Sequence, residues 1–407
     1  MRVTFLTQYY PPEVGAPQAR IAGLAGELRG RGLAVNIHTC FPHYPDGRIR
    51  PPFRNRPWSR DQGEVPVFRS AVYPASNRGF VRRLADQASF ALSALVTAPA
   101  APAADVVVVE TPPLFLAGAA IPYARGKRAA LVVHVADLWP DSAIELGAVS
   151  NPAAIRAARA MERAAYSAAA AIVCPTEGIA SRLEARPESA GKVTRIPPSV
   201  DADRFAAAAG EREVGQGASD APFRVLYAGT VGMSQGVETL VQAAEAMSGL
   251  EGVEIVIAGD GAEAPQLRAR LERGGASNVR MLGAVPHERV PDLYAEADAA
   301  VVLLRDRPLF QGALPTKMLE AMAAAKPLVL SASGEAAGFI ERAGAGVVVA
   351  PERPQELAAA LVSLSRDRDG AEALGRAGRR FVEAGYARPA AAERWLELLR
   401  RVAPEEG

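Results

Sequence analysis

Short apolar runs rich in β-branched residues alternate along the chain with alanine-rich stretches. The runs are "VTFLTQ", "AVNIHT", "DVVVVE", "LVVHVAD", "AAIVCPT", "RVLYAG", "VEIVIAGDG", "NVRMLG", "AAVVLL", "PLVLSA" and "GVVVAP". They are continuously apolar instead of alternating, which indicates strands covered on both faces, as in parallel sheets with helices on each side. The pattern therefore predicts repeated βαβ units and an α/β fold.

The series of strands restarts after "RIPPSVDADRF", and the weakly patterned residues 206–222 that follow are typical of a linker. We therefore expect two Rossmann-like, doubly wound domains at residues 1–199 and 200–380. The last segment, 381–407, predicts two helices broken at 387–389, with no strand to accompany them. We expect these C-terminal helices to cross back and pack on the first domain.

Composition limits the class of protein but does not define its function. The chain has 407 residues, of which 49% are hydrophobic and 22% charged, and its net charge of +1 gives no global attraction to nucleic acid or membrane. Two cysteines without a metal-ligand spacing favour a reducing cytoplasm. The start "MRVTFLTQYY" runs directly into a strand, and the most apolar segment, 88–104, is interrupted by prolines. We expect neither a cleaved leader nor a membrane-spanning helix.

Glycines follow several predicted strands of the second half. In open parallel sheets, ligands bind beyond the carboxyl ends of the strands, so Gly229, Gly259 and Gly261 are candidates for close approach to a ligand. The stretch "GDGAEA" matches a dinucleotide fingerprint, but the next strand ends in Gly283 instead of the required acid. A nicotinamide site is therefore not predicted.

The stretch "LPTKMLEAMAAAKPLVLS" predicts a helix that begins near Pro315 and stops at Lys326-Pro327. Thr316, Lys317 and Glu320 share one face of this helix at spacings of three and four residues. An amine beside a helix N-terminus attracts anions. The alternative is a solvated Lys-Glu pair, which is common and weak.

Taken with "YAGTVGMSQGVETL", "EIVIAGDG" and "VRMLGAVPHERVPDLYAEADAAVVLL", this stretch resembles the nucleotide-sugar domain of family 4 retaining glycosyltransferases, which have the GT-B fold. The resemblance extends to "TQYYPPEVGAPQAR" and "HVADLWPDSAIELGAV" in the first half. It is similar to the branch of WbuB-like bacterial N-acetyl-L-fucosamine transferases of polysaccharide assembly. The resemblance implies two domains facing a cleft that holds the donor.

The resemblance also implies roles. Glu320 would hold the donor ribose, Lys317 and the amides of the 312–314 loop would meet the diphosphate and sugar, and Val285 would face the base. Two positions depart from the family: Gly312 stands where a second glutamate is common, and Gln235 where a lysine is frequent. The expected donor-binding residues are Gly15, Gly229, Gln235, Gly259, Gly261, Val285, Gly312, Ala313, Leu314, Thr316, Lys317 and Glu320.

Three candidate features lie in the first half. Gly15 precedes a predicted helix, where its amide could approach the diphosphate, or it could belong to a plain turn. His134 and Asp137 end a predicted strand, but residues three apart on a strand point to opposite faces. We therefore favour Asp137, and keep His134 as a second candidate that could equally be structural. The expected catalytic residues are Asp137, His134 and Lys317.

Residues 41–83 contain nine arginines, three acids and no lysine, with aromatic residues between them. Such a segment could bind nucleic acid, or it could be a solvated loop whose arginines pair internally. An anionic membrane carrying a lipid-phosphate acceptor fits the predicted architecture better. The expected membrane and acceptor residues are Arg48, Arg50, Arg54, Arg56 and Trp58.

These observations predict a retaining glycosyltransferase of surface polysaccharide (O-antigen) biosynthesis. It would move a hexosamine-type sugar, such as N-acetyl-fucosamine, from a UDP-linked donor to a lipid-linked saccharide acceptor. We expect no metal or other cofactor, no nucleic acid, and a cytoplasmic location at the inner membrane surface. Two alternatives stay open. A nucleotide-sugar 2-epimerase would need several carboxylates and histidines around the sugar ring, which is difficult with only four histidines in the chain. A non-catalytic nucleotide-sugar-binding protein at the membrane would be consistent with Gly312 in place of a glutamate.

Overall fold

The computed structural model describes residues 1–13, 15–44, 46–76, 80–145, 147, 149–210, 222–247, 252–274 and 276–404. The chain forms two compact units: unit 1 comprises Met1–Pro197 and Arg388–Gly407, and unit 2 comprises Pro198–Ala387. The chain thus enters unit 2 two residues earlier than the predicted boundary and returns to unit 1 at Arg388 instead of 381, because one helix continues through that position. Most of the expected linker, 211–221, lies outside the described residues.

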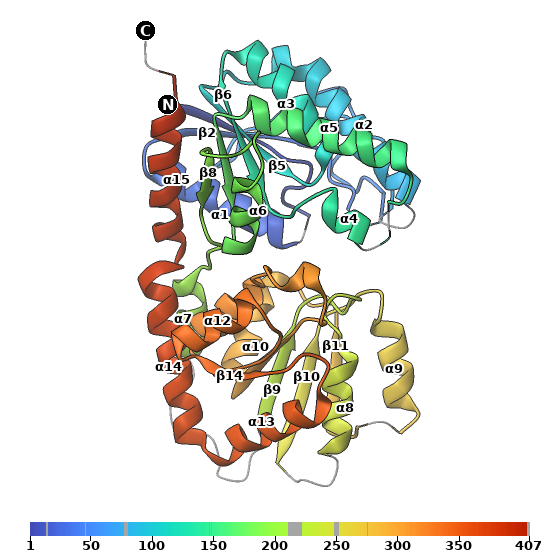
Figure 1. Ribbon diagram of the computed structural model, residues 1–407, viewed down its shortest axis with the longest axis vertical. Coiled ribbons are helices and arrows are strands. Elements are labelled where there is room, and N and C mark those ends of the chain that lie inside the picture. Colours follow the sequence, from blue (N-terminus) through green and yellow to red (C-terminus); the bar gives the residue numbers. More distant parts are fainter. Residues whose placement is uncertain are drawn as a thin grey trace. The chain divides into compact units, whose positions relative to one another are not determined.

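Unit 1 contains an eight-stranded sheet in the order β3-β4-β2-β1-β5-β6-β7-β8 (Figure 1). Its neighbouring strands pair in parallel except β3 with β4, which are antiparallel. The strands are β1 (Arg2–Leu6), β2 (Ala34–Cys40), β3 (Trp58–Asp61), β4 (Val67–Ser70), β5 (Val106–Thr111), β6 (Ala130–Val135), β7 (Ala171–Cys174) and β8 (Val193–Arg195).

Helices cover both faces of this sheet. They are α1 (Ala16–Gly30), α2 (Phe80–Thr97), α3 (Leu114–Lys127), α4 (Asp141–Glu145), α5 (Pro152–Ala168), α6 (Glu177–Glu184) and α15 (Arg388–Val402). Helices α1 and α15 pack on one face, while α2, α3 and α5 pack on the other (Figure 1). Strand β5 is buried along its whole length, which explains why its run of four valines is continuous.

Unit 2 contains a six-stranded, all-parallel sheet in the order β11-β10-β9-β12-β13-β14 (Figure 1). The strands are β9 (Phe223–Ala228), β10 (Val253–Ala258), β11 (Val279–Gly283), β12 (Ala299–Leu303), β13 (Leu328–Ser331) and β14 (Gly346–Val349). The helices are α7 (Ala202–Gly210), α8 (Glu238–Ala246), α9 (Ala264–Glu272), α10 (Val290–Glu296), α11 (Thr316–Ala323), α12 (Glu335–Ala343), α13 (Pro354–Arg366) and α14 (Arg368–Gly385). Helices α8, α9 and α13 cover one face, and α7, α10, α11, α12 and α14 the other.

The α/β fold with two doubly wound parallel sheets is therefore confirmed, and every predicted strand is present. Three strands were not predicted: β3, β4 and β8. Strands β3 and β4 lie inside the arginine-rich segment, where β4 extends the sheet from β2 and β3 forms its edge. Neither cysteine forms a disulfide, since Cys40 and Cys174 are both free and buried. Among the described helices, none combines the length and apolar character needed to cross a bilayer.

Helix α15 brings the end of the chain onto the first sheet. The Trp395 ring is 5% exposed and packs edge-on against Phe5 of β1, with ring centres 6.3 Å apart. It also meets His134 of β6 at 5.7 Å. Together with Leu396 and Leu399, Trp395 completes the apolar layer that α1 begins. The C-terminal helix is thus part of the core of unit 1.

Replacing Trp395 by alanine should lower the free energy of unfolding of unit 1 by about 3–5 kcal/mol, because it removes a large buried ring from a close-packed layer. Urea unfolding followed by far-ultraviolet circular dichroism measures this loss. Trp58→Ala is the matched control, because Trp58 is 48% exposed and its loss should cost far less. Equal losses in the two variants would show that α15 is not a core element.

Candidate functional site

Lys317 lies in the first turn of α11, where Pro315 provides an extended N-cap. Its Nζ atom stands 4.4 Å from the centre of the Tyr227 ring and donates a hydrogen bond to the Tyr227 hydroxyl at 3.2 Å. That hydroxyl in turn donates to the carbonyl of Thr230 at 2.5 Å. A cation over an aromatic face is held electrostatically, so Tyr227 fixes the ammonium group at the carboxyl end of β9. The sequence analysis did not identify Tyr227.

Gly229, at the end of β9, provides the space for this ammonium group. A Cβ atom at Gly229 would lie 2.7 Å from Lys317 Nζ, and its φ of 138° is one that side chains rarely adopt. The positive φ favours glycine at this position, and the absence of a side chain lets the ammonium group lie over it.

Glu320 lies one turn further along α11 and is half-buried. Among the described residues, its carboxylate has no hydrogen bond or ion pair, and Lys317 contacts Tyr227 instead of Glu320. The solvated Lys-Glu pair is therefore not what the helix forms. Burial raises the pKa of Glu320, and Lys317 and Arg204 oppose that rise.

The Lys317 ammonium group is also shifted by its surroundings. Burial lowers the pKa of Lys317 to about 8, and the negative charge of Glu320 opposes the shift. The amine loses its charge more readily than an ordinary lysine, because it lies in a partly desolvated position beside the helix N-terminus. An added anion would stabilise the charged form.

The glycines after β10 have a structural purpose that the sequence analysis did not foresee. A Cβ atom at Gly259 would lie 1.8 Å from the Gly229 carbonyl, and one at Gly261 would lie 2.3 Å from the Val231 carbonyl. The two loops are joined by backbone hydrogen bonds, from Val231 N–H to the Asp260 carbonyl and from Gly229 N–H to the Ala258 carbonyl. The β9–α8 loop thus fills the space that a side chain at either glycine would occupy, and contacts of Gly259 and Gly261 with a donor stay predictions.

The other expected donor residues lie on loops, or in the first turn of α11, after the carboxyl ends of the strands. The Gln235 side chain folds over Gly232, whose missing Cβ would lie 3.1 Å from Gln235 Oε1. The Ala313 amide donates to the Phe310 carbonyl, so it is already engaged. Half-buried positions are found for Val285, Gly312, Leu314 and Thr316. Their contacts with a donor stay predictions.

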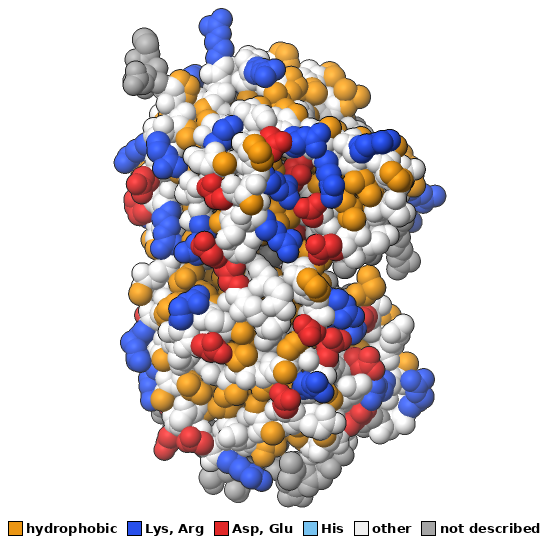
Figure 2. All heavy atoms as spheres, in the orientation of Figure 1, with side chains coloured by type: hydrophobic (Ala, Val, Ile, Leu, Met, Phe, Trp, Pro, Cys, Tyr) orange, Lys and Arg blue, Asp and Glu red, His pale blue; other side chains and the backbone are white. Residues whose placement is uncertain are grey.

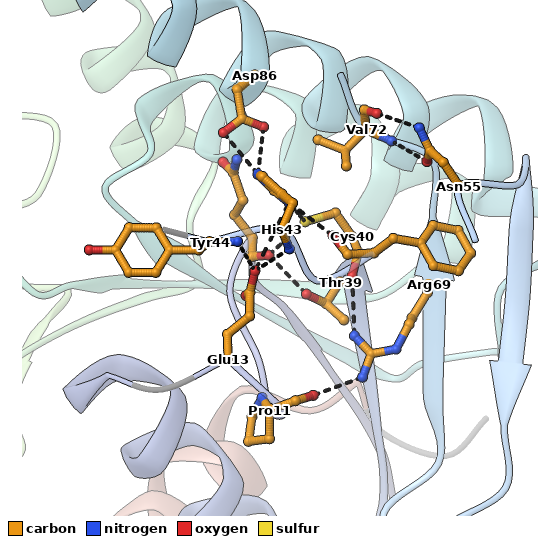
Figure 3. A network of polar contacts seen from close by, with 12 residues as sticks. Pro11, Glu13, Thr39, Cys40, His43, Tyr44, Asn55, Arg69, Val72 and Asp86 are labelled. Carbon is orange, nitrogen blue, oxygen red and sulfur yellow. Dashed lines mark hydrogen bonds and ion pairs between the residues drawn. The ribbon is translucent and has the colours of Figure 1, made fainter. Parts of the chain in front are cut away.

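In unit 1, Gly15 is the N-cap of α1, and a Cβ there would lie 2.4 Å from Gln18 Oε1. The loop before it is fixed by Glu13, whose Oε1 accepts hydrogen bonds from the backbone N–H groups of His43 and Tyr44, both at 2.7 Å (Figure 3). His43 Nε2 faces Asp86 on α2 at 3.1 Å (Figure 3). This buried network, which sequence spacing did not reveal, ties the loop bearing Gly15 to two other elements.

The partners of His43 in this network favour its protonated form. Its Nδ1 lies 2.9 Å from the Phe41 carbonyl and its Nε2 faces the Asp86 carboxylate, so both ring nitrogens meet acceptors. Burial lowers the pKa of His43, but Asp86 and the other acceptors outweigh it, and the net shift is upward.

The two catalytic candidates of unit 1 lie in different surroundings. His134 is 7% exposed and packs on Trp395, and burial lowers its pKa well below the usual range, so it is neutral. Asp137 lies beyond the end of β6, is half-buried, and its Oδ2 accepts a hydrogen bond from Ser142 Oγ at 2.8 Å. The structure gives His134 a packing role, and the catalytic roles of both residues stay predictions.

The arginine-rich segment separates into exposed and buried members. Arg48, Arg54 and Arg56 are exposed, with no ion pair among the described residues, whereas Arg50 pairs with Asp46. Trp58 is half-exposed and stacks on Phe68.

Arg69 is the exception among these arginines. It is buried and bonds to Asp61. It also donates to the carbonyls of Cys40 and Pro11 (Figure 3). Internal pairing thus accounts for Arg69 and Arg50 but not for Arg48, Arg54 and Arg56. On the face shown in Figure 2, charges of both signs are interspersed over the surface, so any electrostatic attraction must come from such local groups.

Comparisons with known proteins agree with this geometry. Residues 15–199 match the family described as glycosyl transferase 4-like domain, and residues 211–381 match glycosyl transferases group 1. WcaI of Escherichia coli (strain K12), provisionally named a colanic acid biosynthesis glycosyl transferase, is 23% identical over 86% of this chain and 89% of its own. A GDP-mannose-dependent alpha-(1-6)-phosphatidylinositol monomannoside mannosyltransferase of Mycobacterium tuberculosis (strain CDC 1551 / Oshkosh) is 31% identical over 52% of this chain and 56% of its own.

Solved structures share the fold. Sucrose-phosphate synthase from Thermosynechococcus elongatus has a TM-score of 0.77 at 19% identity, with 98% of both chains covered. HepE of Anabaena in complex with UDP-glucose has a TM-score of 0.72 at 17% identity, with 98% of this chain and all of HepE covered. WaaG, a glycosyltransferase involved in lipopolysaccharide biosynthesis, has a TM-score of 0.70 at 17% identity, with 97% and 99% covered.

The two α/β units and these neighbours define the GT-B fold. Residues 211–381 belong to the glycosyl transferases group 1 and residues 15–199 to the glycosyl transferase 4-like domain family, so both halves of the chain are glycosyltransferase domains. The predicted enzyme class is thereby confirmed, while the N-acetyl-L-fucosamine branch stays a prediction.

Lys317 should titrate near pH 8, well below the ordinary lysine pKa of 10.5, because its ammonium group is partly desolvated. The chain contains four lysines, so NMR titration of ¹³C-methylated side chains can follow each of them, with Lys317→Arg identifying the signal. The Lys317 cation is present below about pH 8 and lost above it. A Lys317 signal that titrates near 10.5 would contradict the environment described here.

Proposed function

We propose that the protein is a retaining glycosyltransferase whose unit 2 binds a nucleoside diphosphate sugar at the start of α11. The observation that carries this proposal is the arrangement of Lys317 and Glu320: a lysine held on Tyr227 at a helix N-terminus, and a half-buried carboxylate one turn away without a protein partner among the described residues. Lys317 suits a diphosphate, and Glu320 suits the hydroxyls of a ribose. The complex of HepE with UDP-glucose supports a nucleotide-sugar donor.

The proposed reaction replaces one bond at the anomeric carbon with another. The acceptor hydroxyl attacks this carbon on the face from which the diphosphate leaves, so the configuration is retained, and the hydroxyl proton passes to the leaving diphosphate. Negative charge develops on the leaving diphosphate, where Lys317 and the α11 N-terminus stabilise it. We expect no metal requirement, because these groups supply the positive charge. The first donors to test are UDP-linked hexosamines, including UDP-N-acetyl-fucosamine.

Glu320→Gln should weaken donor binding by about tenfold to a hundredfold, because it replaces charge-assisted hydrogen bonds with neutral ones. Lys317→Ala should lower single-turnover transfer more than binding, because the charge on the leaving group grows in the transition state. Calorimetry and single-turnover assays measure the two effects. Lys326→Ala, at the other end of α11, is the control and should change neither.

The same assays distinguish the remaining functions. A 2-epimerase would change the sugar without releasing nucleotide, and a non-catalytic binder would release no nucleoside diphosphate even with acceptor present. Wild-type donor affinity in both Glu320→Gln and Lys317→Ala would leave α11 an ordinary amphipathic helix.

We propose further that the acceptor is a lipid-linked saccharide and that unit 1 meets an anionic membrane surface. Beside the exposed arginines, α2 carries three exposed apolar side chains, Val81, Leu92 and Val96, at 77%, 64% and 72% exposure. Arg60 of β3 bonds to the Ala100 carbonyl just beyond α2, so the arginine-rich segment and this helix adjoin. Arginine with apolar side chains suits anionic lipid headgroups. The phosphatidylinositol-linked substrate named for the mycobacterial relative supports a lipid acceptor.

Replacing Arg48, Arg50, Arg54 and Arg56 by serine should release the protein from vesicles that contain anionic lipid, because each arginine near such a surface contributes about 1 kcal/mol. Sedimentation with phosphatidylglycerol-containing vesicles measures the binding, and raised salt should mimic the change. The matched control replaces four exposed arginines of unit 2 and removes the same charge: Arg273, Arg353, Arg366 and Arg380. Equal binding of both quadruple variants would remove the membrane role of this segment.

A further inference from the structure

Arg305 follows β12, so it lies at the carboxyl ends of the strands, as Lys317 does. It is attached to the β9–α8 loop in three ways. Its backbone N–H donates to the Ser234 carbonyl at 3.0 Å, and its Nε donates to the Met233 carbonyl at 2.7 Å. Its aliphatic part lies against Gly236, where a Cβ would come within 3.1 Å of Arg305 Cγ. This loop, residues 229–236, also carries Gly229 and Gln235.

The other end of the Arg305 guanidinium is held by two carboxylates. Its Nη2 lies 3.1 Å from Glu263 and its Nη1 lies 3.2 Å from Glu352. Glu263 precedes α9 and donates its own backbone N–H to the Val231 carbonyl, while Glu352 follows β14 and accepts from the Asp306 amide. Arg305 therefore joins three strand-end loops, and its charge is neutralised by carboxylates from two of them.

We propose that Arg305 is a positioning residue, which holds the 229–236 loop in the conformation that receives the donor diphosphate and does not bind the phosphates itself. The proposal rests on the function proposed above. A guanidinium suits this role because its planar fork can bond several partners at once, which a lysine cannot do. Its Nε, Nη1 and Nη2 groups are each already engaged, so the two ion pairs would have to break before the guanidinium could turn away from the carboxylates.

The opposite possibility is that Arg305 exchanges its carboxylates for the diphosphate and so replaces the lysine absent at Gln235. The two roles predict changes of opposite sign for Glu263→Gln. If Arg305 positions the loop, weakening this ion pair loosens the loop and lowers nucleotide affinity. If Arg305 binds phosphate, the same change frees the guanidinium and raises the affinity.

The experiment titrates UDP and GDP by calorimetry into the wild type, Arg305→Ala and Glu263→Gln. We expect Arg305→Ala to weaken binding about tenfold if the loop then spends about a tenth of its time in the competent conformation. Glu263→Gln should weaken binding by a smaller factor. Tighter binding by Glu263→Gln, or unchanged binding by Arg305→Ala, would overturn the proposal.

Arg224→Ala is the matched control. Arg224 also pairs with two carboxylates, Glu254 at 2.9 Å and Glu296 at 3.6 Å, and its side chain is 29% exposed against 26% for Arg305. It lies near the start of β9, so it is at the opposite end of the strands from Arg305. We expect Arg224→Ala to reduce thermal stability as Arg305→Ala does, but to leave nucleotide affinity unchanged. An equal loss of affinity in both variants would reduce Arg305 to a general stabilising role and overturn the proposal.

Hydrogen exchange provides a measurement that needs no nucleotide. The amides of the 229–236 loop should exchange faster in Arg305→Ala than in the wild type or in Arg224→Ala. If the wild type binds neither nucleotide, the proposed function fails, and exchange still decides whether Arg305 holds the loop. Unchanged exchange in Arg305→Ala would overturn the positioning role.

Discussion

The site in unit 2 depends on a lysine ammonium group held, partly desolvated, at a helix N-terminus. The helix N-terminus is positive like the ammonium group, because the first turn of a helix presents unsatisfied N–H groups and the positive end of its dipole. The Tyr227 ring and hydroxyl hold Lys317 without neutralising it, and Glu320 acts on it without contact. Positive charge that is not paired with a carboxylate in this way favours an anion.

The neighbouring loops are shaped around this lysine. Gly229 is a glycine because the ammonium group lies over it, and Gly259 is a glycine because the loop that carries Gly229 must pass close by. A side chain at either position would displace the β9–α8 loop or the lysine. The glycines that follow the strands are thus linked to the charge of the site through backbone packing.

Much of the fold could be predicted from the sequence, because strands buried on both faces are continuous runs of apolar residues, as "VVVV" in β5 is. Strand β3 has no such run. It has four residues, two of them charged, and it lies at the edge of the sheet, where solvent replaces one neighbouring strand. Strand β8 has only three residues. These strands exist because a neighbouring strand offers backbone partners, and that information is not local.

The same limit applies to the site. Helical spacing predicted correctly that Lys317 and Glu320 share a face, but Tyr227 is 90 residues from Lys317, and only the folded sheet brings them together. His134 shows the reverse case: its position near the end of a strand suggested chemistry, yet Trp395 from the last helix covers it.

Two departures from the family pattern, Gly312 and Gln235, remove one negative and one positive side chain from the loops around the donor. The charge of these loops then depends on how the remaining charged side chains, Arg305 and Lys317, are paired. Arg305 is an arginine close to the Gln235 loop, but it is neutralised by Glu263 and Glu352. Lys317 has no carboxylate in contact among the described residues. Of these two groups, Lys317 at the start of α11 keeps its charge unpaired with any carboxylate that the structure describes, while Arg305 holds the neighbouring loops together.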